Sequence, residues 1–162
     1  MNNNLIFETE NFLVKAAEKP HITRTDGGHI VIIPKIRLAD RTQLSPKLAI
    51  ELMRLTMISG EAMVTAMNKR GVDIGRINYQ DSGNWGVKKP EGPYLHISLY
   101  GRAKSAKVQK WGESLNLPLR EINPQFYEKN EPLNEGDIKE IKSQIKIVLK
   151  KGKYADKNWS IR

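Results

Sequence analysis

The strongest hydrophobic pattern in the chain lies between residues 45 and 70 and predicts one long amphipathic helix. Ser45 suits the N-cap, Pro46 suits the first helical position, and Gly71 stands where a helix commonly ends. Apolar and small side chains recur between these signals at three- and four-residue spacing, namely Leu48, Leu52, Leu55, Ser59, Ala62, Met63 and Ala66. We therefore expect this helix to pack one face against a sheet.

Short apolar runs on both sides of that helix predict strands. These runs are rich in β-branched or aromatic residues and span residues 5–9, 12–16, 29–33, 73–79 and 94–101. A second helix is predicted at about 134–151, capped by Asn134, with an apolar stripe of Ile138, Ile141, Ile145 and Val148. Strands and helices do not alternate regularly. The pattern indicates an α+β fold, an antiparallel sheet of about five strands with one long central helix and a C-terminal helix.

The amino-acid composition excludes several classes of site and reaction. The 162 residues fit one domain, and the absence of cysteine excludes disulfides, thiol catalysis and thiolate metal sites. No apolar run approaches the roughly 20 residues that span a bilayer, and residues 1–4 do not start like a secretory signal. We therefore expect a cytoplasmic protein that does not bind a membrane.

The charge is strongly positive and uneven. The chain has 27 basic and 18 acidic residues, a net charge of +9, of which +6 falls in residues 102–162 (14 basic against 8 acidic). Such a field attracts phosphorylated ligands and nucleic acids alike. The basic stretch 102–111 is equally typical of a solvated surface, so charge alone indicates anionic partners without choosing among them.

His96 is the best candidate for a reactive group. Side chains alternate along a strand, so Leu95, Ile97 and Leu99 are expected to face the long helix, and His96 the opposite side. Its neighbours two residues away, Tyr94 and Ser98, both carry hydroxyls. The alternative is a half-exposed histidine on an outer sheet face with no chemical role.

Three segments of the sequence resemble the histidine triad superfamily. They are the Gly-His-apolar-Pro-Lys run at 28–35, Asn78 near the end of its strand, and residues 93–102, which end in Gly-Arg. The resemblance runs from about Phe7 to Arg102. It implies a histidine triad domain over 1–118 and a C-terminal extension over 119–162 that belongs to the same globular unit.

The resemblance also implies roles for individual residues. In the family the middle histidine of His-x-His-x-His attacks the α-phosphate of a nucleotide; here this strand reads Tyr94-x-His96-x-Ser98, so His96 is the implied nucleophile. The residues implied as substrate contacts are His29, Asn78, Tyr94, Ser98 and Arg102. On the residues alone, His29 can equally be a structural cap of its strand, and Asn78 a turn-forming residue. His21 matches no motif position and is expected at the surface.

The function implied is that of a hydrolase or nucleotidyltransferase that forms a nucleotidyl intermediate on His96. Its substrate would be a dinucleoside polyphosphate or a phosphoramidate, without a cofactor and without a metal, because residues 21, 29 and 96 lack the spacing of a metal site. The alternative is a catalytically weak or inactive module that binds nucleotide or RNA, since two triad histidines are replaced. The resemblance further implies a homodimer.

Overall fold

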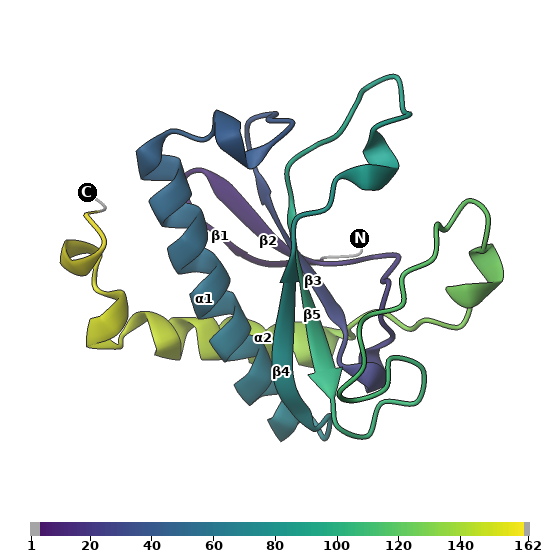
Figure 1. Cartoon of the computed structure of the whole chain (residues 1–162). Helices are drawn as coiled ribbons and strands as arrows, with labels where there is room; N and C mark the ends of the chain where they lie inside the picture. The colour runs from purple at the N-terminus through teal and green to yellow at the C-terminus, as the bar shows by residue number, and fades with distance from the viewer. Residues whose placement is uncertain (1–3, 161–162) are drawn as a thin grey trace.

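The computed structural model describes residues 4–160 and is built on a five-stranded antiparallel sheet with strand order β1-β2-β3-β5-β4 (Figure 1). The strands are β1 (Leu5–Glu8), β2 (Phe12–Ala16), β3 (His29–Pro34), β4 (Ile74–Gln80) and β5 (Ile97–Ala103). The α-helices of this part of the chain are α1 (Pro46–Lys69) and α2 (Glu135–Leu149). The predicted α+β fold is confirmed.

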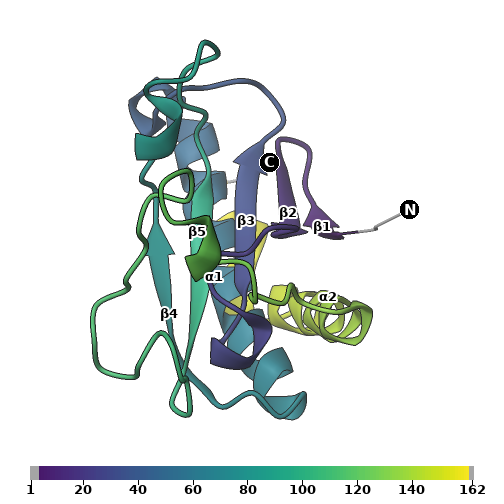
Figure 2. The same ribbon diagram turned by 90° about the vertical axis from the view of Figure 1, so that its right-hand side faces the viewer.

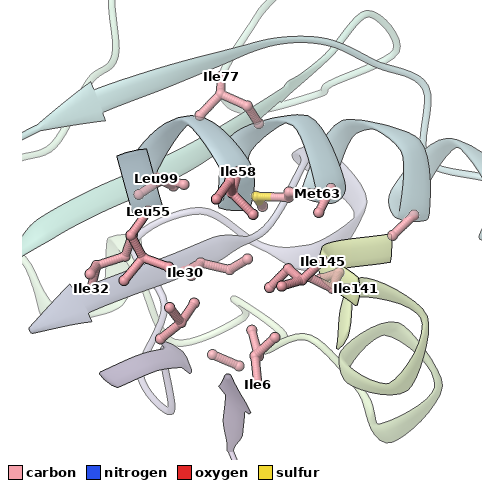
Figure 3. Packing of buried hydrophobic residues seen from close by; sticks show 14 of the residues in the cluster. Ile6, Ile30, Ile32, Leu55, Ile58, Met63, Ile77, Leu99, Ile141 and Ile145 are labelled. Carbon is pink, nitrogen blue, oxygen red and sulfur yellow. The ribbon is translucent and has the colours of Figure 1, made fainter. Parts of the chain in front are cut away.

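Helix α1 begins and ends at the residues that its sequence signals predict. The Ser45 hydroxyl accepts a hydrogen bond from the Leu48 amide at 3.3 Å, Pro46 is the first helical residue, and Gly71 follows the helix with a φ of +82°. The buried side of α1, including Leu55 and Ile58, packs on the sheet (Figure 3). Burial of each such side chain stabilises the fold by about 1.5–3 kcal/mol.

Helix α2 lies beside α1 and also contacts β1 (Figures 1 and 2). Ile141 and Ile145 have no exposed surface and belong to the same core as Ile6 of β1 (Figure 3). The apolar stripe predicted for α2 therefore packs into the same hydrophobic core as the buried side of α1.

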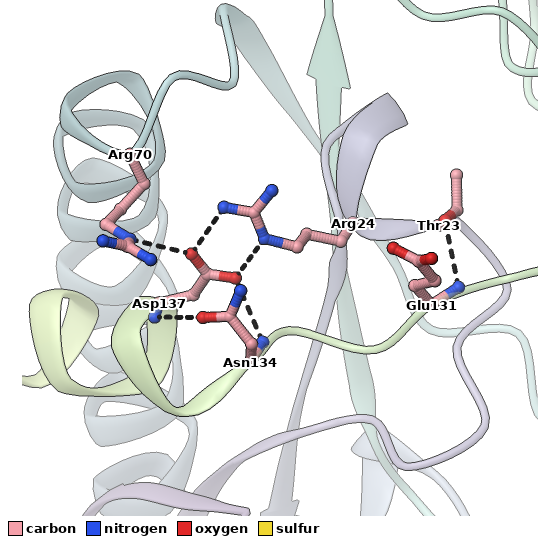
Figure 4. Close-up of polar contacts among 6 residues, drawn as sticks. All are labelled: Thr23, Arg24, Arg70, Glu131, Asn134 and Asp137. Atoms are coloured by element: carbon pink, nitrogen blue, oxygen red, sulfur yellow. Dashed lines mark hydrogen bonds and ion pairs between the residues drawn. The ribbon is translucent and has the colours of Figure 1, made fainter.

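A buried carboxylate fixes the start of α2. Asp137 has no exposed side-chain surface, and its oxygens accept hydrogen bonds from Arg24 at 2.5 and 2.9 Å and from Arg70 at 3.1 Å (Figure 4). Asn134 and Asp137 also form a capping box. Burial alone would raise the pKa of Asp137, but the hydrogen bonds from Arg24 and from the Asn134 amide outweigh it and lower the pKa. We call Asp137, Arg24, Arg70 and Asn134 the Asp137 cluster.

Strand β5 begins at Ile97, three residues later than predicted. The last β3–β5 pair joins Ile32 to Ile97. Before it, the Leu95 amide donates to the Leu38 carbonyl at 2.7 Å, so the chain leaves the ladder to follow the loop after β3. His96 consequently lies immediately before the strand.

Residues 104–133, which we call the covering segment, run over the face of the sheet opposite α1 (Figures 1 and 2). The buried carboxylate of Asp26 holds one end of this segment, because it accepts hydrogen bonds from the amides of Lys107, Val108 and Gln109 at 2.8–2.9 Å. The outer-face residues Ser98, Tyr100 and Arg102 of β5 are buried. The covering segment therefore shields this face of the strand, apart from the cavity described below.

Candidate functional site

A cavity of about 570 Å³ lies on this outer face, over the start of β5. It is lined by the even-numbered residues from Tyr94 to Tyr100, by much of the loop 80–92, and by Leu115 and Leu117 of the covering segment. His21 and Arg37 complete the lining from the other side of the chain. We call this space the His96 cavity.

The geometry of His96 suits a nucleophile. Its Nδ1 lies 2.8 Å from the Tyr94 carbonyl oxygen. A carbonyl only accepts hydrogen bonds, so Nδ1 carries the proton, and the lone pair of the neutral ring is on Nε2. No side chain within residues 4–160 is hydrogen-bonded to Nε2, and the residue lines the cavity. The residue is thus held in one tautomer with its basic nitrogen available.

Tyr94 and Ser98, the neighbours of His96 two residues away on either side, both line the cavity. The Tyr94 hydroxyl donates its one proton to the Pro34 carbonyl, so it is committed to the end of β3. Ser98 is 3 % exposed, and its hydroxyl interacts with that of Tyr100. Of the two, Ser98 retains the better position for contact with a ligand.

His21 belongs to the site, and the expectation that it lies at the surface is wrong. Its Nδ1 is 2.8 Å from the Tyr100 hydroxyl, and its ring centroid is 4.8 Å from that of Trp85. Burial, together with the charges of Arg120 and His96, lowers the pKa of His21 to about 4. The His21 ring is therefore neutral at pH 7 and forms part of the cavity wall. Its sequence position after Pro20 carries no pattern from which this could be inferred.

His29 lies behind the cavity and does not line it. The ring is buried, and its Nδ1 accepts a hydrogen bond from the His21 amide at 3.3 Å. Nε2 then carries the proton and has no partner among the described residues. Burial, followed by the charges of His21 and His96, places the pKa of His29 well below its ordinary value. This geometry favours the structural alternative for His29.

The expectation that Arg102 supplies charge to a ligand is corrected by its contacts. Its guanidinium donates to the Asn78 side chain at 2.8 Å and to the carbonyls of Lys110 and Glu113 at 2.8 and 2.9 Å. Neither Arg102 nor Asn78 lines the cavity. Alternation does put Arg102 on the same side as His96, but the covering segment folds over it. Together these residues hold residues 110–113 against the sheet.

The cations that do line the cavity are Arg37 and Lys89. Arg37 stacks over the Tyr94 ring at 5.2 Å, and its Nη2 donates to the carbonyls of Glu91 and, at 3.4 Å, Gly92. No sequence pattern marked either residue as part of a site. They lie in loops, where no periodicity marks a side chain as facing a site.

Two further classes of site find no support within residues 4–160. No group of three or more histidine, acidic or cysteine side chains is placed to hold a metal ion. Neither α1 nor α2 is both long and apolar enough to cross a bilayer.

Comparison with known proteins identifies the fold. No protein-family model matches the sequence, and no curated protein matches it either. A hypothetical histidine triad nucleotide-binding protein of Sulfolobus tokodaii superposes with a TM-score of 0.60 at 15 % identity, covering 94 % of this chain and 89 % of its own.

Two bacterial structures agree with this result. A Hit-like protein involved in cell-cycle regulation from Bartonella henselae has a TM-score of 0.55 at 11 % identity, covering 92 % of this chain and 88 % of its own. A zinc-bound histidine triad family protein from Mycobacterium smegmatis has a TM-score of 0.56 at 16 % identity, covering 89 % and 84 %. The chain therefore has the histidine triad fold, as its motifs predict.

Proposed function

We propose that the protein binds a nucleotide in the His96 cavity and transfers its nucleotidyl group through a covalent intermediate on His96. The observation that carries this proposal is the hydrogen bond from Nδ1 to the Tyr94 carbonyl, which leaves the Nε2 lone pair at the wall of a nucleotide-sized space. The description of the Sulfolobus protein as nucleotide-binding supports the same assignment.

The proposed reaction has two displacements at the α-phosphorus. The Nε2 lone pair forms an N–P bond while the P–O or P–N bond to the leaving group breaks, and that group departs with the electron pair. Water or another acceptor then attacks phosphorus, the N–P bond breaks, and its electron pair returns to Nε2. The attacking water loses one proton to solvent. Throughout, the proton stays on Nδ1, and its hydrogen bond to the Tyr94 carbonyl stabilises the positive charge on the ring.

The cavity offers different partners at its two ends. His96 and Tyr100 are four residues apart, or about 13 Å along an extended chain. Near Tyr100, the rings of His21 and Trp85 offer apolar faces on which a base can stack. Near His96, Ser98 can donate one hydrogen bond to a phosphoryl oxygen. We assign the base to the first end and the α-phosphate to the second.

Intact-mass analysis after incubation with nucleoside phosphoramidates and dinucleoside polyphosphates tests the proposal. We expect a nucleotidyl adduct that peptide mapping places on His96 and that is absent from His96→Ala. His21→Asn removes a histidine from the same cavity without removing the nucleophile, so this control should still form the adduct. An adduct on another residue, or none on any substrate, contradicts the proposal.

A nucleotide-binding module without turnover is the second candidate. It is favoured by the neutral state of His21 and by the committed hydroxyl of Tyr94, which leave few donors for the transition state. Tight nucleotide binding without adduct or product would select it. The homodimer and the cytoplasmic location stay predictions, of which sedimentation tests the first.

A further inference from the structure

We infer that Arg37 and Lys89 form an anion clamp for the leaving group, so that the preferred substrate is a nucleoside polyphosphate and not a phosphoramidate. This inference rests on the proposed function of His96 and chooses between the two substrate classes.

Three ionised side chains line the described cavity: the cations Arg37 and Lys89, and the carboxylate of Glu91. The two histidines nearest to His96 are kept neutral by burial, and Arg102 is tied to backbone carbonyls away from the lining. Positive charge for a phosphate chain must therefore come from Arg37 and Lys89. The solvated carboxylate of Glu91, on a loop, offsets only part of this positive charge.

Arg37 is held in a fixed position. Nη2 donates to the carbonyls of Glu91 and Gly92, and the guanidinium carbon lies over the Tyr94 ring, 5.2 Å from its centroid. The Nε and Nη1 groups form no hydrogen bond within residues 4–160, so they keep donors for a ligand. A planar guanidinium with donors to spare is well suited to a phosphate oxygen pair.

A tight turn connects the backbone of Lys89 to the carbonyl that Arg37 binds. The Gly92 amide donates to the Lys89 carbonyl at 2.9 Å, and Gly92 has a φ of +70°, which glycine adopts without strain. The Gly92 carbonyl in turn accepts from Arg37. Lys89 forms no ion pair among the described residues and lines the cavity. Two cations, Arg37 and Lys89, thus line the cavity where the turn at Gly92 meets it.

The charge and protonation of the leaving group distinguish the two substrate classes. A polyphosphate leaves as an anion, which needs positive charge but no proton. An amine leaving from a phosphoramidate must take up a proton as its P–N bond breaks. Guanidinium and ammonium groups stabilise charge but are poor proton donors at neutral pH, and the nearby histidines are neutral. The cavity is therefore suited to the first reaction.

The test compares kcat/KM for a dinucleoside tetraphosphate and a phosphoramidate of the same nucleoside. We expect the wild type to prefer the tetraphosphate, and Arg37→Ala/Lys89→Ala to lower kcat/KM for the tetraphosphate about 10²-fold and that for the phosphoramidate by much less. Lys88→Ala, on the exposed neighbour that does not line the cavity, is the charge-matched control. Equal losses on both substrates, or a wild type that prefers the phosphoramidate, overturn the inference.

A binding measurement separates failure of the clamp from failure of the proposed function. Calorimetry with inorganic tripolyphosphate needs no catalysis. We expect binding to the wild type and to Lys88→Ala, and at least a tenfold weaker association with the double variant, about 1.4 kcal/mol. Binding unaffected by the double substitution overturns the clamp even if His96 forms an adduct. Clamp-dependent binding without any adduct supports the clamp and rejects the nucleophile.

Discussion

The Asp137 cluster and the His96 cavity are two polar centres of the same domain with opposite electrostatic designs. In the first, one buried carboxylate accepts from two arginines and a capping amide, so its charge is fully compensated within the protein. In the second, two cations line a solvent-accessible space that holds one carboxylate, and burial keeps His21 and His29 neutral beside it. Compensated charge holds segments together. Charge left uncompensated at a cavity is available to a ligand.

The largest effect is expected from Asp137→Ala. Removing the carboxylate takes from Arg24 and Arg70 the buried counter-charge that they share, which should lower the free energy of unfolding by about 3–5 kcal/mol. Urea denaturation measures this change. Asp156→Ala is the control, because Asp156 is 68 % exposed in its ion pair with Arg54, and its loss should cost about 0–1 kcal/mol. Equal costs would contradict the contrast between a compensated buried charge and a surface pair.

A second, smaller effect is expected from pH, and it should separate the two centres. The pKa of His21 falls from 6.5 to about 4 on folding, so the unfolded chain binds more protons between these values. The free energy of unfolding should be constant above pH 7 and fall as the pH drops from about 6.5 to 4, by at most about 1.4 kcal/mol per pH unit for each histidine. Partial solvation of His21 makes its own share smaller.

Asp137 acts in a different pH window. Its lowered pKa means that its contribution is present above the ordinary aspartate pKa and is lost as pH falls below it. Denaturation curves at a series of pH values should therefore show that His21→Gln reduces the loss between pH 6.5 and 4. Asp137→Asn should leave that window unchanged and remove part of the loss below about pH 4. A common window for both variants would contradict the assignment.

The smallest effect is expected at the aromatic end of the cavity. Trp85→Ala should weaken nucleotide binding by about 1–3 kcal/mol, because a stacking surface for the base is lost. Trp111→Ala is the matched control: Trp111 is 44 % exposed and packs near Gly75, outside the cavity. Fluorescence titration with a mononucleotide compares the two. Weakening by both variants alike would argue against base stacking on Trp85.

Elements with local signals were predictable from sequence. The caps and period of α1, the stripe of α2 and the alternation around His96 depend on neighbouring residues, and the structure confirms both helices and the sheet. The late start of β5 was not predictable. It follows from the Leu95–Leu38 hydrogen bond, which joins residues far apart in the chain.

The site was less predictable than the fold because long-range folding decides its composition. His21 reaches the cavity through contacts with Tyr100 and Trp85, each more than sixty residues away in sequence. Arg102 has the strand parity expected of a site residue, yet carbonyl groups of the covering segment take its donors. Backbone carbonyls occur at every residue, so the sequence contains no mark of which ones will be used.

The Asp137 cluster also bears on how the chain folds while it is synthesised. Arg24 and Asp137 are 113 residues apart. The sequence separation between Ile6 and its core partners Ile141 and Ile145 is larger still. At about 5–20 residues per second, roughly 6–23 s pass between the synthesis of Arg24 and that of its counter-ion. Until then the sheet and α1 expose the apolar surface that α2 later covers. Docking of α2 is thus the step that buries this apolar surface and protects a nascent chain of this fold from aggregation.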